Sequence, residues 1–303
     1  GMKKMMLLLS MLILVVFSAA CGSGSNQSVS NGTNEDQKLE TEGEANKDLP
    51  KVKLRFGHNA PAKSPTGRAA EKLAEIVKEK TNGNFIIEVY PDSLLGDNRD
   101  LVEQTSIGGL DMSMAGLGVL GYLADEYNLM QVPFLFRDQD HIHKVVEGEI
   151  GKQLADRLLK EKNILLLSQS WDRFPRQVTA NKEIKSPDDL KNIILRSGTK
   201  AATEAFKILG AKPNDVPLNE LYLSLQSGVV EAAELPPDYV LNLSVYEVNT
   251  HLNMLNHTYG TQFVAINGKK FAELPEEYQT ILKEAVMEAG NYNNELTKQE
   301  ESE

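Results

Sequence analysis

In this sequence of 303 residues cysteine is scarce and basic residues are outnumbered by acidic ones, and each feature argues against a class of protein. A single Cys excludes a disulfide scaffold and a zinc-ribbon array. The 32 Lys and Arg against 43 Asp and Glu give a formal net charge of −11, so we expect no nucleic-acid partner. A small anionic ligand stays possible, because it needs only one or two cations in a sheltered cleft. The length exceeds what one hydrophobic core usually fills, which predicts two domains.

Motifs for metal or phosphate chemistry are missing as well. None of the five His belongs to an H-E-x-x-H pair. Neither the G-x-x-x-x-G-K-[ST] phosphate loop nor the G-x-S-x-G nucleophile elbow occurs. We therefore expect no metal site, no cofactor and no enzyme.

One motif supports a competing hypothesis, a nucleotide-dependent dehydrogenase. Gly116, Gly118 and Gly121 satisfy G-x-G-x-x-G after a plausible strand, and Asp138 lies about where a ribose-binding acid would. The dinucleotide fingerprint belongs to a compact βαβ unit, whereas this segment runs into the apolar residues 132–136. The match to the motif is therefore weak support for a dehydrogenase, because the surrounding sequence does not fit a dinucleotide-binding unit.

The N-terminal segment has the pattern of a secretory leader. Lys3 and Lys4 precede an apolar run that ends at Ala20 and is shorter than the ~20 residues of a membrane-spanning helix, so we predict a signal peptide at residues 1–20. The residues from Ser18 to Cys21 resemble a bacterial lipobox, which predicts lipidation of Cys21 and an extracytoplasmic protein held at the cell membrane by a lipid anchor. Ordinary secretion, or an uncleaved leader with an inert Cys21, is the alternative.

The next residues read as a tether. Residues 22–50 are rich in Gly, Ser, Asn and Glu and hold almost no large apolar side chains. Such a segment buries too little surface to offset its ordering entropy. We predict that residues 21–50 comprise the lipidated Cys and a flexible linker.

Strand and helix patterns alternate from residue 51 onward. Period-two or apolar runs predict strands near 52–56, 85–90, 110–115, 164–168, 193–195, 229–233 and 260–266. Amphipathic patterns predict helices near 69–80, 97–106, 140–147, 150–161, 199–209, 219–226 and 276–289, and Ser186-Pro187-Asp188-Asp189 has the form of a helix start. Strands separated by helices predict an α/β fold with largely parallel sheets.

Several short segments of this body resemble, in order, the solute-binding proteins of tripartite ATP-independent periplasmic (TRAP) transporters, the DctP-like family. The resemblance covers nearly all of the chain from residue 51 to about 290. The segments are Phe56-Gly57-His58-Asn59, Lys80-Thr81-Asn82-Gly83, Tyr90-Pro91, Val132-Pro133-Phe134-Leu135-Phe136-Arg137, Gly148-Glu149-Ile150-Gly151, Arg176-Gln177-Val178-Thr179-Ala180-Asn181, Leu195-Arg196, Leu209-Gly210-Ala211-Lys212-Pro213 and Gln226-Ser227-Gly228-Val229-Val230.

The resemblance implies a periplasmic-binding-protein type of fold with two discontinuous α/β domains, mixed and largely parallel sheets, and a ligand cleft between them. Residues 51–172 plus 262–303 would form domain I and residues 173–261 domain II, with a long helix bracing both. The closed protein would deliver an organic acid to TRAP membrane permease subunits.

The resemblance also implies that Arg196 forms a two-pronged salt bridge with the ligand carboxylate and that Arg176 assists. The chemistry agrees, because a guanidinium is always charged and its parallel N–H donors match a carboxylate. Arg196 also follows an apolar strand, at the end where α/β sheets place ligands. A surface or interdomain salt bridge is the alternative for each arginine.

Two departures from the family pattern affect the ligand and the chain end. Leu235 stands where the family usually has an Asn that contacts the carboxylate. Family members usually continue past a segment like residues 295–303, so we expect a truncated C-terminus.

The residues expected near the cleft suggest which acid is bound. Acidic side chains accept hydrogen bonds from hydroxyls and repel a second carboxylate, while aromatic faces suit a sugar ring. This mixture favours a sugar acid such as a uronate; a C4-dicarboxylate, a sialic acid and a 2-oxo acid are alternatives, and Trp171 could equally belong to the core with the acids on the surface. The residues are His58, Asn59, Trp171, Asp172, Arg173, Glu234 and Tyr239.

Overall fold

The computed structural model describes residues 49–302, so the predicted leader, Cys21 and most of the predicted linker lie outside the described residues. The strands are β1 (Val52–His58), β2 (Phe85–Tyr90), β3 (Met112–Gly116), β4 (Ile164–Asp172), β5 (Arg176–Ala180), β6 (Ile194–Arg196), β7 (Lys212–Asn214), β8 (Ala232–Leu235), β9 (His251–Thr258) and β10 (Thr261–Asn267). The α-helices are α1 (Pro65–Lys80), α2 (Asn98–Ile107), α3 (Gln139–Val146), α4 (Glu149–Lys162), α5 (Lys200–Ile208), α6 (Leu221–Gln226), α7 (Pro237–Asn242), α8 (Gly268–Glu273) and α9 (Glu276–Glu301). Short 3-10 helices are η1 (Leu117–Tyr122), η2 (Asp125–Gln131), η3 (Pro187–Leu190), η4 (Leu218–Glu220) and η5 (Val245–Glu247).

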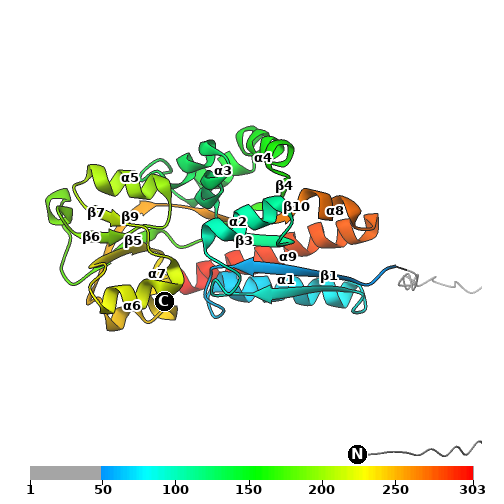
Figure 1. The fold of residues 1–303 in the computed structure, drawn as a ribbon, viewed down its shortest axis with the longest axis horizontal. Helices are drawn as coiled ribbons and strands as arrows, with labels where there is room; N and C mark the ends of the chain where they lie inside the picture. Colours follow the sequence, from blue (N-terminus) through cyan, green and yellow to red (C-terminus); the bar gives the residue numbers. More distant parts are fainter. Residues whose placement is uncertain (1–48, 303) are drawn as a thin grey trace, which may run out of the picture. The chain divides into compact units, whose positions relative to one another are not determined.

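The strands form two five-stranded sheets, each in its own lobe (Figure 1). Lobe I contains the sheet β2-β1-β3-β10-β4, and lobe II contains the sheet β7-β6-β8-β5-β9. Helices cover both faces of each sheet, and each face buries its own apolar cluster, two in lobe I and two in lobe II. The predicted α/β fold with two sheets is confirmed.

Both sheets are mixed, and parallel pairs are no more frequent than antiparallel ones. In lobe I, β1 runs parallel to β2 and β3, while β10 runs antiparallel to β3 and β4. In lobe II, β6 runs parallel to β7 and β8, while β5 runs antiparallel to β8 and β9. The cause is the short connections between lobes: a strand that enters from the other lobe starts at the edge where its neighbours end, so it runs back against them.

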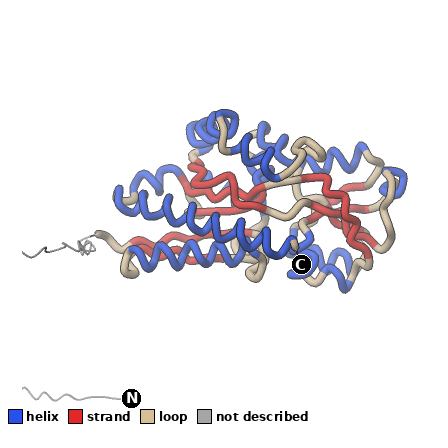
Figure 2. The backbone as a smooth tube through the Cα atoms, turned by 180° about the vertical axis from the view of Figure 1, so that it is seen from behind, coloured by secondary structure: helices blue, strands red, loops and turns tan. Residues whose placement is uncertain are grey.

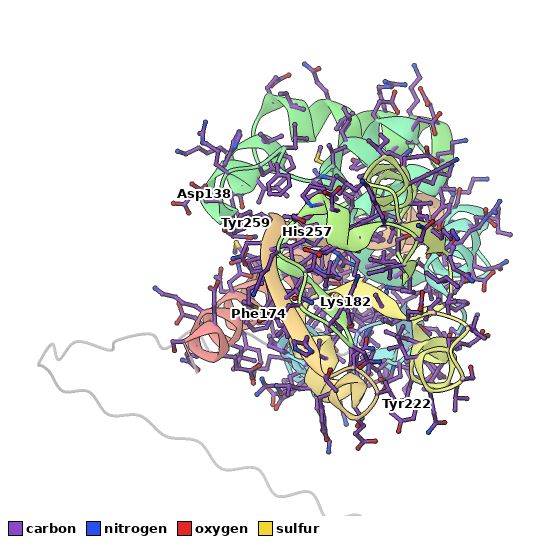
Figure 3. All side chains as sticks on the ribbon, turned by 90° about the vertical axis from the view of Figure 1, so that its left-hand side faces the viewer. Asp138, Phe174, Lys182, Tyr222, His257 and Tyr259 are labelled. Atoms are coloured by element: carbon purple, nitrogen blue, oxygen red, sulfur yellow. The ribbon has the colours of Figure 1, made fainter. Side chains whose placement is uncertain are left out.

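The chain passes between the sheets through residues 173–175, after β4, and residues 259–260, after β9. Figure 3 labels Phe174 and Tyr259 on these two crossing segments and His257 at the end of β9. The crossings place the inner edges of both sheets next to each other. Parallel strands of both lobes end at those edges, which positions the site described below.

Local signals in the sequence account for several helix ends. The side chain of Ser64 accepts a hydrogen bond from the Gly67 backbone N–H at the start of α1, with Pro65 in the first turn. Asp97 and Asp100 form a capping box at the start of α2. A short helix starts after Ser186, as predicted: the Asp189 side chain accepts a hydrogen bond from the Ser186 backbone N–H, although η3 lasts only four residues.

The C-terminal helix α9 has 26 residues and packs along α1 and β4. The Trp171 Nε1–H donates to the Val286 carbonyl, and Asn293 Nδ2 donates to the Asp172 carbonyl. Figure 2 shows α9 crossing in front of the sheet of lobe I in this rear view, with its C-terminal end beside lobe II. There Thr297 lines a small pocket together with Pro236 and Asp238 of lobe II, so α9 touches both lobes.

Candidate anion-binding site between the lobes

A pocket lies where strand ends of the two lobes meet. Its cavity volume is about 20 Å³, and a neighbouring pocket of about 220 Å³ shares Asn98, Arg196, Gly198 and Leu218 with it. Lobe I contributes residues that follow β1 and β3, and lobe II contributes residues that end or follow β6 and β8, as expected for a ligand site of α/β sheets. The lining residues are Asn59, Asn98, Gly116, Val119, Arg173, Arg176, Arg196, Gly198, Thr199, Leu218, Leu235, Pro236 and Tyr239.

Arg196 ends β6, and its side chain is only 4% exposed. Its Nε donates to the Val216 carbonyl at 3.0 Å. Its terminal nitrogens lie 3.1 and 3.2 Å from where a Cβ on Gly198 would stand, so this glycine lets the guanidinium approach the backbone. Burial, reinforced by the charge of Arg176, lowers the pKa of Arg196 to about 10, which leaves it charged at neutral pH.

Arg196 has no carboxylate oxygen within 4.0 Å in the part of the chain that the structure describes. A buried cation without a counter-ion is costly in a folded protein. The guanidinium is therefore suited to bind an anion that enters the pocket.

Arg176 begins β5 and is paired with a carboxylate. It binds Glu234 through two nitrogens, with Nη2 at 2.8 Å from Oε2, and Nη2 also donates to the Glu234 carbonyl at 2.9 Å. The His257 Nε2 lies 3.0 Å from Oε1 of the same carboxylate. Burial alone would raise the pKa of Glu234, yet Arg176 and His257 hold it well below its usual range. Glu234 therefore stays ionised and neutralises Arg176.

The other predicted site residues divide into two groups. Asn59 and Tyr239 line the pocket, and the Asn59 Oδ1 and the Tyr239 hydroxyl have no hydrogen-bond partner within residues 49–302. His58 is fully buried beside Asn59 and does not line the pocket.

Trp171 and Asp172 also lie outside this pocket. Trp171 is 1% exposed within the apolar cluster between the lobe I sheet, α1 and α9. Asp172 faces α3, where its Oδ1 lies 2.5 Å from the His143 Nε2 and accepts a hydrogen bond from Gln139. Asp172 therefore does not reach the pocket, and Glu234 is already paired with Arg176, so neither carboxylate has the position expected for repelling a second carboxylate of the ligand.

Sequence reasoning missed two pocket residues, Asn98 and Thr199. Asn98 opens α2, and Thr199 caps α5 by accepting a hydrogen bond from the Ala202 backbone N–H. The available signal was a capping residue after a predicted strand, which is Thr199 itself after β6 and Asp97, the neighbour of Asn98, after β2.

The G-x-G-x-x-G segment has a packing role. After β3 the chain forms the 3-10 helix η1, not the α-helix of a dinucleotide-binding unit. A Cβ on Gly118 would lie 1.9 Å from Cγ of Gln131, and one on Gly121 would lie 2.1 Å from Oδ1 of Asn128. These glycines allow η1 to pack closely against η2 and the residues beside it.

Residues 49–302 contain neither a cluster of metal-binding side chains nor a membrane-spanning helix. No group of three or more His, Cys, Asp or Glu side chains in that range could hold a metal ion. None of the helices in that range combines the length and apolarity needed to cross a bilayer.

Two mixed sheets joined by short crossings around a cationic pocket define the class of bacterial solute-binding proteins. Residues 56–303 match the family model described as bacterial extracellular solute-binding protein, family 7 (DctP), and the chain belongs to this family. It is therefore a TRAP-type binding protein of the extracytoplasmic space that takes organic acids, and not an enzyme.

Known relatives show what similar chains bind. The chain is 33% identical over 250 residues to the 2,3-diketo-L-gulonate-binding periplasmic protein YiaO of Escherichia coli, covering 82% of this chain and 76% of the relative. A TRAP periplasmic solute-binding protein of Sulfurospirillum deleyianum with bound succinate matches at a TM-score of 0.77 and 29% identity, covering 82% of this chain and 81% of that one. Another from Xanthobacter autotrophicus, with bound β-D-galacturonate, matches at a TM-score of 0.75 and 27% identity, covering 80% and 81%.

Proposed function

We propose that this protein captures a sugar acid such as a uronate outside the cytoplasm and delivers it to TRAP membrane permease subunits. The observation that carries the proposal is the buried Arg196, whose guanidinium faces the pocket without a carboxylate partner among residues 49–302. The ligand carboxylate binds Arg196 in two-pronged fashion. Arg176, already held by Glu234, adds positive potential beside it.

The polar side chains of the pocket favour a hydroxylated ligand. Asn59, Asn98 and Thr199 can donate to and accept from hydroxyl groups. Relatives that bind 2,3-diketo-L-gulonate or galacturonate support a sugar acid. The relative with bound succinate keeps a C4-dicarboxylate as the alternative, together with sialic and 2-oxo acids.

Closure of two lobes around the ligand completes the proposed mechanism. The crossings at residues 173–175 and 259–260 support hinged domains at 51–172 plus 262–303 and at 173–261. The predicted lipid on Cys21 would hold this binding unit at the membrane, next to the permease.

Calorimetric titration with D-galacturonate, D-glucuronate, D-galactonate, N-acetylneuraminate, pyruvate and succinate tests the proposal. We expect a sugar acid to bind best, and Arg196→Ala to weaken that binding by about 30-fold to several thousand-fold, since truncating one partner of a buried charge pair costs about 2–5 kcal/mol. Arg137→Ala, at an exposed arginine outside the pocket, is the matched control and should bind normally. Unchanged affinity in Arg196→Ala would remove Arg196 from the site, and binding of succinate alone would reject the sugar acid.

A further inference from the structure

Arg173 is the first residue of the crossing segment 173–175, and its guanidinium lies between the lobes. It lines the pocket together with Arg176 and Arg196. A Cβ placed on Gly116 of β3 would lie 2.0 Å from Nη1 of Arg173, so this glycine leaves the space that the guanidinium occupies. On the side of lobe II, Cζ of Arg173 is 5.9 Å from the ring centroid of Tyr239. Residues of both lobes thus hold Arg173 against the pocket.

Two of the three arginines that line the pocket are not directly paired with a carboxylate of the described residues, although Asp215 lines the adjoining pocket together with Arg196. Within residues 49–302, neither Arg173 nor Arg196 has a carboxylate oxygen within 4.0 Å, whereas Arg176 is paired with Glu234. A ligand with one carboxylate would offset one of the two remaining charges. The second guanidinium, that of the half-buried Arg173, would stay without a carboxylate partner in this part of the chain.

Asp238 is an acidic side chain near Arg173, and it compensates only in part. It lines the small pocket that Arg173 also touches, and its Oδ1 has no hydrogen-bond partner in the described part of the chain. Burial raises the pKa of Asp238 to about 7, although the charge of Arg173 opposes the shift. Asp238 is therefore held less firmly in its charged form than an exposed carboxyl, and it offsets the charge of Arg173 only in part.

We propose that Arg173 is a further ligand-contacting residue that selects acids with a second anionic group, one carboxylate binding Arg196 and the other binding Arg173. The inference rests on the proposed function and narrows the sugar acid to a hydroxylated diacid of the aldarate type. Asn59, Asn98 and Thr199 line the same pocket and would bind hydroxyls between the two carboxylates.

The first test uses the unaltered protein and two matched pairs of ligands. Galactarate and galactonate, and likewise glucarate and gluconate, differ at one end, where the diacid has a carboxylate and the monoacid a hydroxymethyl group. Calorimetry should show the diacid binding about 10- to 100-fold tighter in at least one pair, as expected for hydrogen bonds to a charged group of about 1.5–3 kcal/mol. Monoacids that bind as tightly as their diacids overturn the role of Arg173 while leaving the proposed function intact. If neither the pairs nor the uronates bind, the proposed function fails and this inference falls with it.

Two variants then assign the preference to Arg173. Arg173→Gln should lower diacid affinity by about 10- to 100-fold and change the matched monoacid by less than about threefold. Gly116→Ala should reduce the same preference without removing a charge, because its φ of −58° accommodates Ala and the new Cβ displaces the guanidinium. Arg137→Gln, at an exposed position, should keep the wild-type ratio. An equal loss for diacid and monoacid in Arg173→Gln would show a purely structural role and overturn the proposal.

Discussion

His58 illustrates how neighbouring residues of one strand end take different roles. It is fully buried at the end of β1, and neither ring nitrogen has a hydrogen-bond partner within residues 49–302. Its ring lies 5.9 Å from that of Phe56. Asn59 lines the pocket while His58 does not, because successive side chains of an extended segment point to opposite sides. Burial lowers the pKa of His58 to about 4, so the ring is neutral at pH 7.

We predict that His58 makes the protein sensitive to mild acid. The pKa of His58 is lower in the folded state than the ~6.5 of an unfolded chain, so its contribution to stability is complete above pH 6.5 and is lost as the pH falls toward 4. Between pH 7 and pH 5 the wild type should lose about 2 kcal/mol of unfolding free energy through this group. His58→Gln should lack that loss in urea unfolding measured at both pH values. A loss of the same size in His58→Gln would show that other groups cause the acid sensitivity.

At the residue scale, the sequence predicts which residue types would bind the ligand better than it predicts where their side chains lie. Arg176 and Arg196 follow from a resemblance and from the match between guanidinium and carboxylate, and both line the pocket. Trp171 does not line the pocket. It lies in the core because it packs against α9, which is more than a hundred residues further along the chain and could not be placed from the sequence. The sequence predicts only that Arg173 lies near the cleft. Its exact position could not be predicted, because the guanidinium occupies space left free by Gly116, which lies on a different strand.

At the scale of elements, α9 can pack closely against β4 because position 290 of the helix is a glycine. Trp171 is the single Trp of the chain and is 1% exposed. A Cβ on Gly290 of α9 would lie 2.6 Å from Nε1 and 2.9 Å from Cδ1 of that indole. The helix can approach the sheet this closely because position 290 has no side chain.

Gly290→Ala should therefore destabilise the protein, although Ala normally stabilises a helix over Gly by about 1 kcal/mol. The added methyl group would meet the buried indole, and overpacking of this kind costs about 1–3 kcal/mol. Urea unfolding followed by the fluorescence of Trp171 should show a lower free energy of unfolding and a shifted native emission. Met287→Ala, at an exposed position of the same helix, should change stability by less than about 0.5 kcal/mol. A more stable Gly290→Ala protein would contradict this account of the packing.

The predicted helices and strands differ from the observed ones where tertiary contacts, and not the local sequence pattern, determine the secondary structure. β9 carries no clear apolar alternation, because it is an edge strand whose side chains at 251–256 are largely exposed. The sequence predicts the final helix only to residue 289, whereas α9 continues to Glu301. Contacts of its last turns, such as the ion pair of Glu300 with Arg68 on α1, stabilise a polar stretch with little helical pattern of its own.

At the scale of the whole binding unit, contacts at the rim of the pocket join the lobes directly. Tyr122 of η1 in lobe I has its hydroxyl 3.4 Å from Oδ2 of Asp215 in lobe II. Nζ of Lys200, at the start of α5, lies 5.6 Å from the centroid of the Tyr122 ring. Tyr122, Asp215 and Arg196 line one further pocket on this rim, so the rim contact is next to the proposed carboxylate site.

If closure of the lobes retains the ligand, loosening this rim should speed ligand release more than it slows capture. Tyr122→Ala removes the cation–π contact with Lys200, worth about 0.5–2 kcal/mol, so the dissociation rate of a bound sugar acid should rise by about 2- to 30-fold. The association rate should change by less than about threefold, since mutations at one interface act mostly on dissociation.

Tyr122→Phe should behave like the wild type, because a hydrogen bond of 3.4 Å is weak and the ring is kept. Tyr246→Ala, at an exposed tyrosine of lobe II, is the matched control. Stopped-flow measurements showing an equal dissociation rate in Tyr122→Ala and the wild type would mean that the rim contact does not hold the lobes together around the ligand.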